Sequence, residues 1–377
     1  MNAAGLIFSN IHDRTVPQMT RIRTMASIPF GCRYRLIDFP LSNMVNSGIT
    51  NVGVITHYNY QSLMDHIGTG KDWDLARRSG GIRILPPYVA AYENAVAGKL
   101  YSTRLEALLG AQSFIDHCRE ELIVLSDCDA ILNIDLSRVM EEHLRTGAYL
   151  TMVTKRLDAA KHPCSAERDI AEIDADGNVT GLSRSRPERG EVDVCTNLMV
   201  MRREDLQAEL ADALAHGYTS FHRDVIGRNL GRHPIHAFRF NDWYTQIDSL
   251  ETYFSASMEL LAADARNGLF GDPDRKIYTK IRNSAPTRYV GNAKVSNSLI
   301  ADGCVIEGTV ENSILFRGAR IGRGTVVRNS ILLQDTLVGN DVSLNCVITD
   351  KNVVIHDGRT LSGHETMPFF IGKGMTV

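Results

Sequence analysis

The chain has 377 residues, of which 44% are hydrophobic and 23% charged, values typical of a globular protein rather than a disordered or fibrous one. At this length one hydrophobic core rarely suffices, so we expect a larger and a smaller domain. The net charge of −3 gives no overall field that attracts nucleic acid or an anionic membrane, and no apolar run is long enough to predict a membrane-spanning helix.

The cysteines and the N-terminus predict the cellular compartment. The seven cysteines are scattered and form no Cys-x-x-Cys pair, which is typical of free thiols in a reducing compartment. Residues 1–9 have neither the basic leader nor the long apolar run of a signal peptide. We therefore expect a cytoplasmic protein that binds neither nucleic acid nor a membrane.

Short apolar runs alternate with helical patterns over the first two thirds of the chain. The runs that predict β-strands are 4–8, 52–56, 122–126 and 150–154. A helix is expected over 104–117, and another over 249–265 closes this region. The alternation predicts an α/β domain over 1–265 with a mostly parallel sheet. Ligands of such sheets bind beyond the carboxyl ends of the strands, so the segments of interest are 9–20, 57–61 and 127–133.

The rest of the chain has a different pattern. Residues 266–286 are rich in Gly, Asp, Pro and Lys and are expected to form a linker. Over 287–377 a short motif recurs at spacings of 15, 17 and 16 residues, beginning at Asn297, Asn312, Asn329 and Asn345. Repeats of this length with glycine-rich turns predict a parallel β-helix. We interpret the asparagines as a turn ladder that links neighbouring coils, rather than as ligands.

The most informative stretch is 30–49, with the sequence Phe-Gly-Cys-Arg-Tyr-Arg-Leu-Ile-Asp-Phe-Pro-Leu-Ser-Asn-Met-Val-Asn-Ser-Gly-Ile. Arg33 and Arg35 alternate along an extended segment, and Asp38 follows them. By spacing alone, the two arginines are equally compatible with a binding site and with the solvated face of a strand.

This run closely resembles a motif of bacterial ADP-glucose pyrophosphorylases (glucose-1-phosphate adenylyltransferases). Those enzymes have Gly-Gly-Lys in place of Gly31-Cys32-Arg33, followed by the same Tyr-Arg-hydrophobic-Ile-Asp-Phe core. The order of the two domains fits the family over nearly the whole chain. The resemblance implies a nucleotidyltransferase domain of the sugar-nucleotide type and a C-terminal left-handed β-helix. It also implies a place in glycogen biosynthesis, where ATP and glucose 1-phosphate give ADP-glucose and pyrophosphate.

The loop after the first strand departs from the family. Active members carry Gly-Gly-x-Gly-Thr-Arg-Leu there, because only glycine lets backbone N–H groups approach the ATP phosphates closely. This chain has Ile11-His12-Asp13-Arg14 and no glycine, and Asp13 adds a negative charge. The family's downstream Lys-Pro pair corresponds to Met25-Ala26. The resemblance therefore implies that the phosphate contacts are lost.

The metal site also departs from the family. Asp129 aligns with the first of two aspartates that hold Mg²⁺ in active members, whereas Gln246 stands at the second position. An amide is a poor replacement for a carboxylate on a hard cation, and we expect Asp248 not to take its place. The lysine that binds the sugar phosphate corresponds to Arg186, which keeps the charge but not the shape.

These departures predict a regulatory, catalytically impaired subunit, similar to the D-type subunit that some bacteria pair with a catalytic paralogue. We expect an allosteric protein that forms either a homo-tetramer or a hetero-tetramer with that paralogue. Mg²⁺ would serve the assembled enzyme, and this chain itself is expected to require no cofactor. Several arginines near the N-terminus are candidates for an anion pocket that takes a phosphorylated effector or a nucleotide. They are Arg14, Arg21, Arg23, Arg33 and Arg35. The other interpretation of these arginines is ordinary surface ion pairs.

Two further functions remain open. One is a weakly active nucleotidyltransferase that keeps Asp129 and recruits Asp127 or Asp248 for the metal. The other is a hexapeptide-repeat acyltransferase or a structural scaffold, in which the β-helix carries the function. Such acyltransferases usually have a catalytic histidine within the coils, whereas His356 and His364 lie at the extreme end of this β-helix. The regulatory subunit is therefore the first hypothesis.

Overall fold

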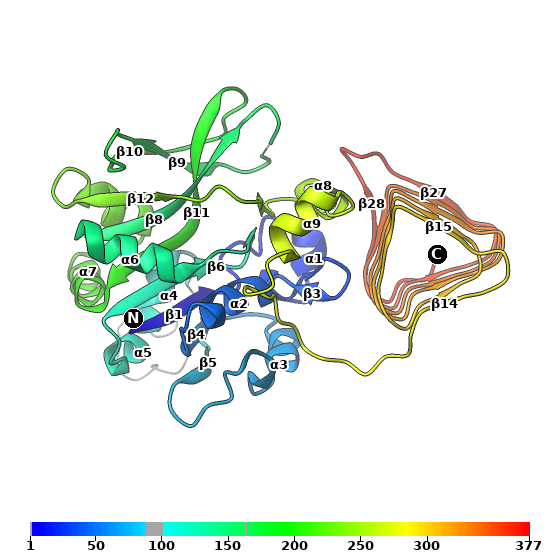
Figure 1. The fold of residues 1–377 in the computed structure, drawn as a ribbon, viewed down its shortest axis with the longest axis horizontal. Coiled ribbons are helices and arrows are strands. Elements are labelled where there is room, and N and C mark those ends of the chain that lie inside the picture. Colours follow the sequence, from blue (N-terminus) through cyan, green and yellow to red (C-terminus); the bar gives the residue numbers. More distant parts are fainter. Residues whose placement is uncertain (1, 88–100, 163) are drawn as a thin grey trace.

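A nine-stranded sheet organises the first domain, and a β-helix forms the second (Figure 1). The computed structural model describes residues 2–87, 101–162 and 164–377. The sheet has the order β10-β9-β11-β6-β1-β4-β5, and β8 pairs with both β11 and β12. The strand bounds are β1 Ala3–Phe8, β4 Asn51–Ile55, β5 Gly81–Leu85, β6 Leu122–Asp127, β8 Leu150–Asp158, β9 Arg168–Ile173, β10 Val179–Ser185, β11 Glu191–Arg202 and β12 Ile235–Arg239.

Most strands of this sheet point in one direction. Strands β6, β1, β4 and β5 are parallel neighbours, and β8 is parallel to β12. Strand β11 is antiparallel to β6, β8 and β9, and β10 is antiparallel to β9, so β10 and β11 run opposite to the rest. The mostly parallel α/β sheet is confirmed. The predicted strands coincide, within one residue, with β1, β4, β6 and the first half of β8.

Helices cover both faces of the sheet. Ile7 of β1 packs in an apolar cluster with α2, α6 and α8, whereas Leu6 and Phe8 pack on the other face with α4, α5 and α7. A strand covered on both sides must be apolar at every position, which explains the continuous apolar runs. The helix bounds are α2 Asp38–Asn46, α3 Gln61–Ile67, α4 Arg104–Gly110, α5 Gln112–His117, α6 Leu136–Thr146, α7 Arg203–His216, α8 Leu250–Glu259 and α9 Ala263–Phe270. None of these described helices is long and apolar enough to cross a membrane.

Two helix predictions need correction. The helix expected over 104–117 is interrupted at Ala111, directly after a glycine, and divides into α4 and α5. The helix expected over 249–265 is interrupted before Ala263 and divides into α8 and α9, and α9 extends into the stretch predicted to be linker from residue 266 onward. Gly268 allows this, because a Cβ there would lie 2.7 Å from the Cβ of Trp243. The glycine permits close packing, and the extended connection begins only after Phe270.

The second domain is a triangular coil of three parallel sheets, each with five strands (Figure 1). This confirms the left-handed parallel β-helix that the family resemblance implied. The first sheet holds β14 Arg288–Tyr289, β17 Val305–Ile306, β20 Arg320–Ile321, β23 Leu337–Val338 and β26 Val354–Ile355. The second holds β15 Lys294–Ser296, β18 Thr309–Glu311, β21 Val326–Arg328, β24 Ser343–Asn345 and β27 Thr360–Ser362. The third holds β16 Leu299–Ile300, β19 Ile314–Leu315, β22 Ile331–Leu332, β25 Val347–Thr349 and β28 Phe369–Ile371.

The asparagine ladder forms a turn between the second and third sheets. Asn297, Asn312 and Asn329 have φ values of 39°, 45° and 46°, in the left-handed region that asparagine tolerates. Asn297 Nδ2 donates to Asn312 Oδ1 over 2.7 Å, which supports the ladder interpretation. The fourth member is displaced by one residue in the backbone. Asn345 pairs as a strand residue, and Cys346, with φ 51°, occupies the turn. The side chain of Asn345 still continues the ladder, because its Oδ1 atom accepts a hydrogen bond from Asn329 Nδ2 over 2.9 Å.

The two domains share one apolar cluster. The third sheet of the β-helix turns a row of apolar side chains toward the first domain, including Ile314, Ile331 and Ile348, in the same cluster as Phe30 and Leu260. A buried ion pair crosses the same contact. Arg23 Nη2 lies 2.8 Å from Asp350 Oδ2, and both side chains are only 2% exposed. The β-helix is therefore fixed to the first domain by apolar packing and by one charge pair.

We predict that Arg23→Met destabilises the domain contact by about 3–5 kcal/mol, because it leaves Asp350 buried without its partner. The double variant Arg23→Met/Asp350→Asn removes both charges and should recover most of this loss. Urea denaturation followed by circular dichroism measures the effect, and Arg288→Met, at an exposed arginine of β14, is the control. A loss below about 1 kcal/mol for Arg23→Met would show that the pair contributes little.

Candidate functional site

The candidate site lies at the carboxyl end of β6, where the chain passes Asp127 and Asp129 and enters β7 (Ala130–Leu132). Strand β7 pairs antiparallel with β13 (Tyr244–Gln246), which brings Gln246 to the end of β6. Gln246 donates a hydrogen bond from Nε2 to Asp129 Oδ2 over 2.8 Å. Gln246, which the resemblance aligned with the second metal ligand, therefore lies beside Asp129 and presents an N–H donor to it.

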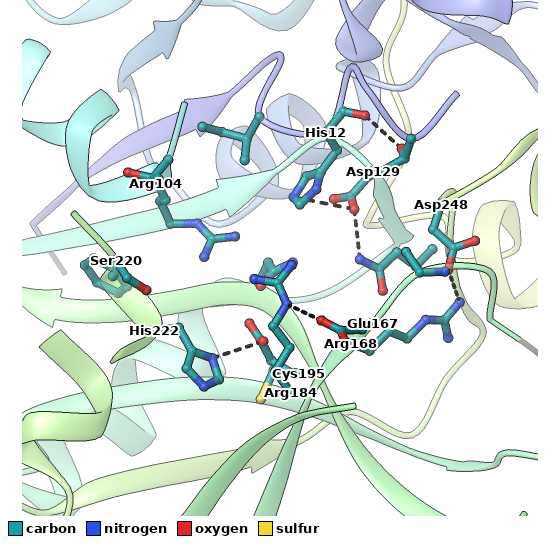
Figure 2. A pocket seen from close by; sticks show the side chains of 18 of the residues that line it. His12, Arg104, Asp129, Glu167, Arg168, Arg184, Cys195, Ser220, His222 and Asp248 are labelled. Carbon is teal, nitrogen blue, oxygen red and sulfur yellow. Dashed lines mark hydrogen bonds and ion pairs between the residues drawn. The ribbon is translucent and has the colours of Figure 1, made fainter. Parts of the chain in front are cut away.

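Two cationic side chains approach the same carboxylates. His12, in the loop after β1, has its Nε2 atom 2.8 Å from Asp127 Oδ2 and 3.7 Å from Asp129 Oδ2. Arg104 Nη2 lies 2.5 Å from Asp127 Oδ2. Arg104 is the first residue of α4, and a capping box between Thr103 and Glu106 fixes the start of that helix. In Figure 2, His12 and Arg104 lie on the same side of the cavity as Asp129.

The protonation states of Asp127, Asp129 and His12 depend on one another. Burial raises the pKa of Asp127, but the Arg104 and His12 charges outweigh it, so the pKa of Asp127 is lowered. Burial and the neighbouring Asp127 charge raise the pKa of Asp129. Burial opposes protonation of His12, yet Asp129 and Asp127 raise the pKa of His12 to about 9. His12 is therefore cationic at neutral pH, and with Arg104 it balances the two carboxylates.

A family-type Mg²⁺ site does not fit these residues. Mg²⁺ needs oxygen ligands in a near-octahedral arrangement. Asp129 Oδ1 is buried and has no hydrogen-bond partner among the described residues, but the amide N–H of Gln246 and the His12 imidazolium face the other oxygen of this carboxylate. Asp248 does not replace the missing carboxylate, because it pairs with Arg168 over 3.2 Å. The partial metal site expected at Asp129 is thus neutralised by protein cations.

The opposite side of the cavity is formed by β9, β10 and β11, and its charges are also paired (Figure 2). Arg184 Nε lies 3.6 Å from Glu167 Oε2, and His222 Nδ1 lies 3.0 Å from Asp169 Oδ1. Arg186, which the resemblance aligned with the sugar-phosphate lysine, is exposed beyond the end of β10 and is not part of the cavity lining. Arg184 lines the cavity instead.

The arginines near the N-terminus do not form one anion pocket. Arg14 and Arg21 are exposed beside a cavity that also includes Tyr58. The other three arginines turn away from that cavity, because the chain reverses at η1 (Met25–Ser27) and again between β2 (Pro29–Phe30) and β3 (Tyr34–Arg35). Arg23 is buried against Asp350, while Arg33 and Arg35 line a small cavity between the domains. The prediction of a single cluster is wrong, because the hairpin separates residues that are close in sequence.

Asp13 has a structural role in the altered loop. Its Oδ1 atom accepts a hydrogen bond from the Met25 backbone N–H over 2.6 Å, which ties the loop to η1. Burial raises the pKa of Asp13 from 3.8 to about 7, although the Met25 N–H and the His12 charge oppose this. The native state therefore binds a proton here more strongly than the unfolded chain does. Stability contributed by this proton is lost as the pH rises from about 4 to 7.

We predict that Asp13→Asn stabilises the protein at pH 8, because the amide keeps the acceptor for Met25 and removes a buried charge. The gain should be about 1–3 kcal/mol at pH 8 and should shrink toward zero near pH 4. Urea denaturation at both pH values measures it. Asp176→Asn, at an exposed position, is the control, and an equal gain from the control would contradict the assignment to Asp13.

Several site residues are missing from the sequence-based prediction. The Thr103-x-x-Glu106 capping box is a recognisable helix start and could have drawn attention to Arg104. His12 was noted only as a substitution in the glycine loop, and nothing in the local pattern showed that it reaches Asp127 across 115 positions. Arg168 and Asn197 also line the cavity, and they carry no sequence signal, because their positions depend on strands that pair at a distance.

Comparisons with known proteins agree with the two-domain architecture. The nucleotidyl transferase family profile matches residues 16–166, and the GlmU-like, C-terminal hexapeptide profile matches residues 285–366. The glycogen biosynthesis protein GlgD of Bacillus subtilis is 30% identical over 373 residues, covering 98% of this chain and 96% of its own length. The glucose-1-phosphate adenylyltransferase of Thermotoga maritima is 32% identical over 334 residues, covering 87% of this chain and 76% of its own length.

The chain belongs to the glucose-1-phosphate adenylyltransferase family. The resemblance drawn from residues 30–49 is thereby confirmed, together with a place among the nucleotidyltransferases of glycogen biosynthesis. The cavity at the end of β6 contains His12 and Gln246, two of the positions at which the resemblance implied a departure from the active members.

Proposed function

We propose that this chain is a regulatory subunit with little or no catalytic activity of its own, acting on a catalytic paralogue. The observation that carries the proposal is the neutralised carboxylate pair. Arg104 and the His12 imidazolium hold Asp127, and Gln246 presents an N–H donor to Asp129. In a metal-dependent phosphoryl transfer the metal neutralises charge that develops during the displacement, and fixed side-chain pairs cannot take over that role.

The altered loop supports the same conclusion. Residues 9–15 have no glycine, and His12 projects from this loop onto Asp127. To bind a triphosphate, this loop would have to bring its backbone N–H groups close to the phosphates. The side chains of its non-glycine residues hinder that approach. Losing one group that stabilises the transition state typically lowers the rate about 100- to 1,000-fold, and here both the loop and the metal site are changed.

The cavity between the two domains is the candidate effector site of this regulatory subunit. It is lined by six basic side chains, Arg33, Arg35, Lys280, Arg282, Arg317 and Lys351. Burial, and after it the neighbouring Arg35 and Arg23 charges, lowers the pKa of Lys351 to about 7. Arg317 is paired with Asp302 over 2.9 Å, and a phosphorylated effector would supply a negative charge to the remaining basic groups. Because the cavity lies between the domains, its occupancy would bias how they sit against each other and thereby the paralogue that contacts them.

The test of the function is pyrophosphate release from ATP and glucose 1-phosphate with Mg²⁺, using this chain alone, its catalytic paralogue alone, and the two mixed. We expect no release above background from this chain alone, because the two carboxylates cannot hold the metal. In the mixture, the rate or the apparent substrate affinity of the paralogue should change severalfold, and both chains should elute together as a hetero-oligomer. Turnover by this chain alone at rates typical of an enzyme would overturn the proposal.

The effector cavity gives a separate prediction that does not depend on catalysis. Bound sulfate, which does not titrate near neutrality, should raise the pKa of Lys351, so binding at pH 8 should take up as much as one proton. The folded-state pKa of about 7 lies below pH 8, so the lysine is mostly neutral before the anion binds. Calorimetry in two buffers of different ionisation enthalpy measures the uptake.

Lys351→Met should abolish the proton uptake and weaken sulfate binding about tenfold, which is about 1.4 kcal/mol. Lys294→Met, at an exposed lysine of β15, should change neither quantity. Sulfate binding with no proton uptake by the unaltered chain would remove Lys351 from the effector site.

The weakly active transferase and the acyltransferase or scaffold are less well supported. Asp248, which the former would recruit for a metal, is held by Arg168 and by the backbone N–H of Ser165. For the latter, His356 lies in the turn after β26 and His364 in the loop after β27, both exposed. The tetrameric assembly and the cytoplasmic location stay predictions.

A further inference from the structure

The cavity at the end of β6 has no free positive charge among the described residues that line it, apart from the His12 imidazolium that already faces Asp127 and Asp129. Each arginine around it has a carboxylate partner. The pairs are Arg104 with Asp127, Arg168 with Asp248 and Arg184 with Glu167, at 2.5, 3.2 and 3.6 Å. The first two pairs are largely buried, so a phosphate dianion placed beside them would have to break one pair and would face the carboxylate that remained. The Arg184–Glu167 pair is weak, because its side chains are 61% and 66% exposed. The electrostatics therefore disfavour a phosphorylated ligand beside the two largely buried pairs.

The same cavity has several free hydrogen-bond acceptors. Asp129 Oδ1, Asn197 Oδ1 and Asp248 Oδ1 are buried, and none has a hydrogen-bond partner among the described residues. The three residues are 1%, 7% and 6% exposed. A buried acceptor left without a donor destabilises the empty cavity, so the cavity favours a ligand that supplies several donors.

Asn197 is held toward the cavity by an irregular strand. The pairing of β11 with β8 shifts register between Cys195 and Met199, and Asn197 in this bulge has φ 61°. Bulges beside functional sites re-aim a side chain, and a non-glycine residue in the left-handed region persists only where the surrounding structure enforces it. The neighbouring Thr196 hydroxyl anchors the bulge by donating to the Val153 carbonyl over 3.0 Å.

We propose that this cavity binds an uncharged sugar ring rather than a sugar phosphate. The hydroxyl groups of a hexose donate to the three free acceptors, and Ile11 and Phe221 in the lining offer apolar surface to the C–H groups of the ring. The cavity volume of about 240 Å³ suits one ring. The preference for an uncharged ligand follows from the paired arginines. The proposal concerns binding only and is independent of the regulatory role.

The test is calorimetric titration of the full-length chain with glucose, maltotriose, glucose 1-phosphate and inorganic phosphate. Glucose or maltotriose should bind at least tenfold more tightly than glucose 1-phosphate, and phosphate should not compete with them. Tighter binding of maltotriose than of glucose would indicate the end of a polysaccharide chain as the ligand, and the reverse a free sugar. Tighter binding of glucose 1-phosphate than of both, or no binding of either sugar, would overturn the proposal.

Two variants test the mechanism of this preference. Asn197→Gly keeps the left-handed backbone and removes one acceptor, so it should weaken sugar binding about tenfold. Asn352→Gly makes the same change at φ 58° on the β-helix and should leave binding unaltered. Glu167→Gln frees Arg184 and should strengthen glucose 1-phosphate binding severalfold, whereas Glu191→Gln, at an exposed strand residue, should not. Unchanged sugar affinity in Asn197→Gly would contradict the assigned contacts.

Discussion

The balance of charge at the end of β6 is the constraint on which the site depends. Asp127 and Asp129 are each 1% exposed, so their charges must be neutralised where water is scarce. In this chain the neutralising groups are Arg104 and the His12 imidazolium. Once these side chains hold the carboxylates, the loop after β1 is fixed over the site, and Gln246 completes the arrangement as a donor to Asp129. This neutralisation by protein side chains is the basis of the proposal that the chain has little catalytic activity of its own.

One short segment links this site to the β-helix. The chain from His12 to Arg35 first contributes to the charged group, then ties itself to η1 through Asp13, and finally places Arg23 against Asp350. The interdomain cavity opens beside the end of the same segment. A ligand in that cavity and a ligand at the end of β6 would therefore act on consecutive parts of one chain segment. Under the regulatory role proposed above, this segment would physically connect the two proposed binding sites.

Much of the fold could be predicted from local pattern, and the errors have physical causes. Parallel strands covered on both faces are apolar throughout, so β1, β4, β6 and the start of β8 were correctly predicted. Composition assigns Gly268 to the linker, because it does not reveal that Trp243 requires a glycine inside α9. Residue identity places the fourth turn of the ladder at Asn345, whereas strand pairing keeps the register and puts Cys346 in that turn, with the Asn345 side chain still bonded to Asn329.

The sequence by itself determined the family, the two-domain order and the two departures, the loop without glycine and Gln246 at the metal position. The two-domain order follows from periodicity and repeat spacing, whereas the family and the two departures follow from the resemblance of residues 30–49 and of neighbouring motifs to that family. Only the tertiary structure decided which charges meet. His12 reaches Asp127, Arg23 reaches Asp350, and Arg184 rather than Arg186 lines the cavity. Local pattern gives the face on which a side chain lies but not its partner, because these contacts depend on how distant strands and domains pack.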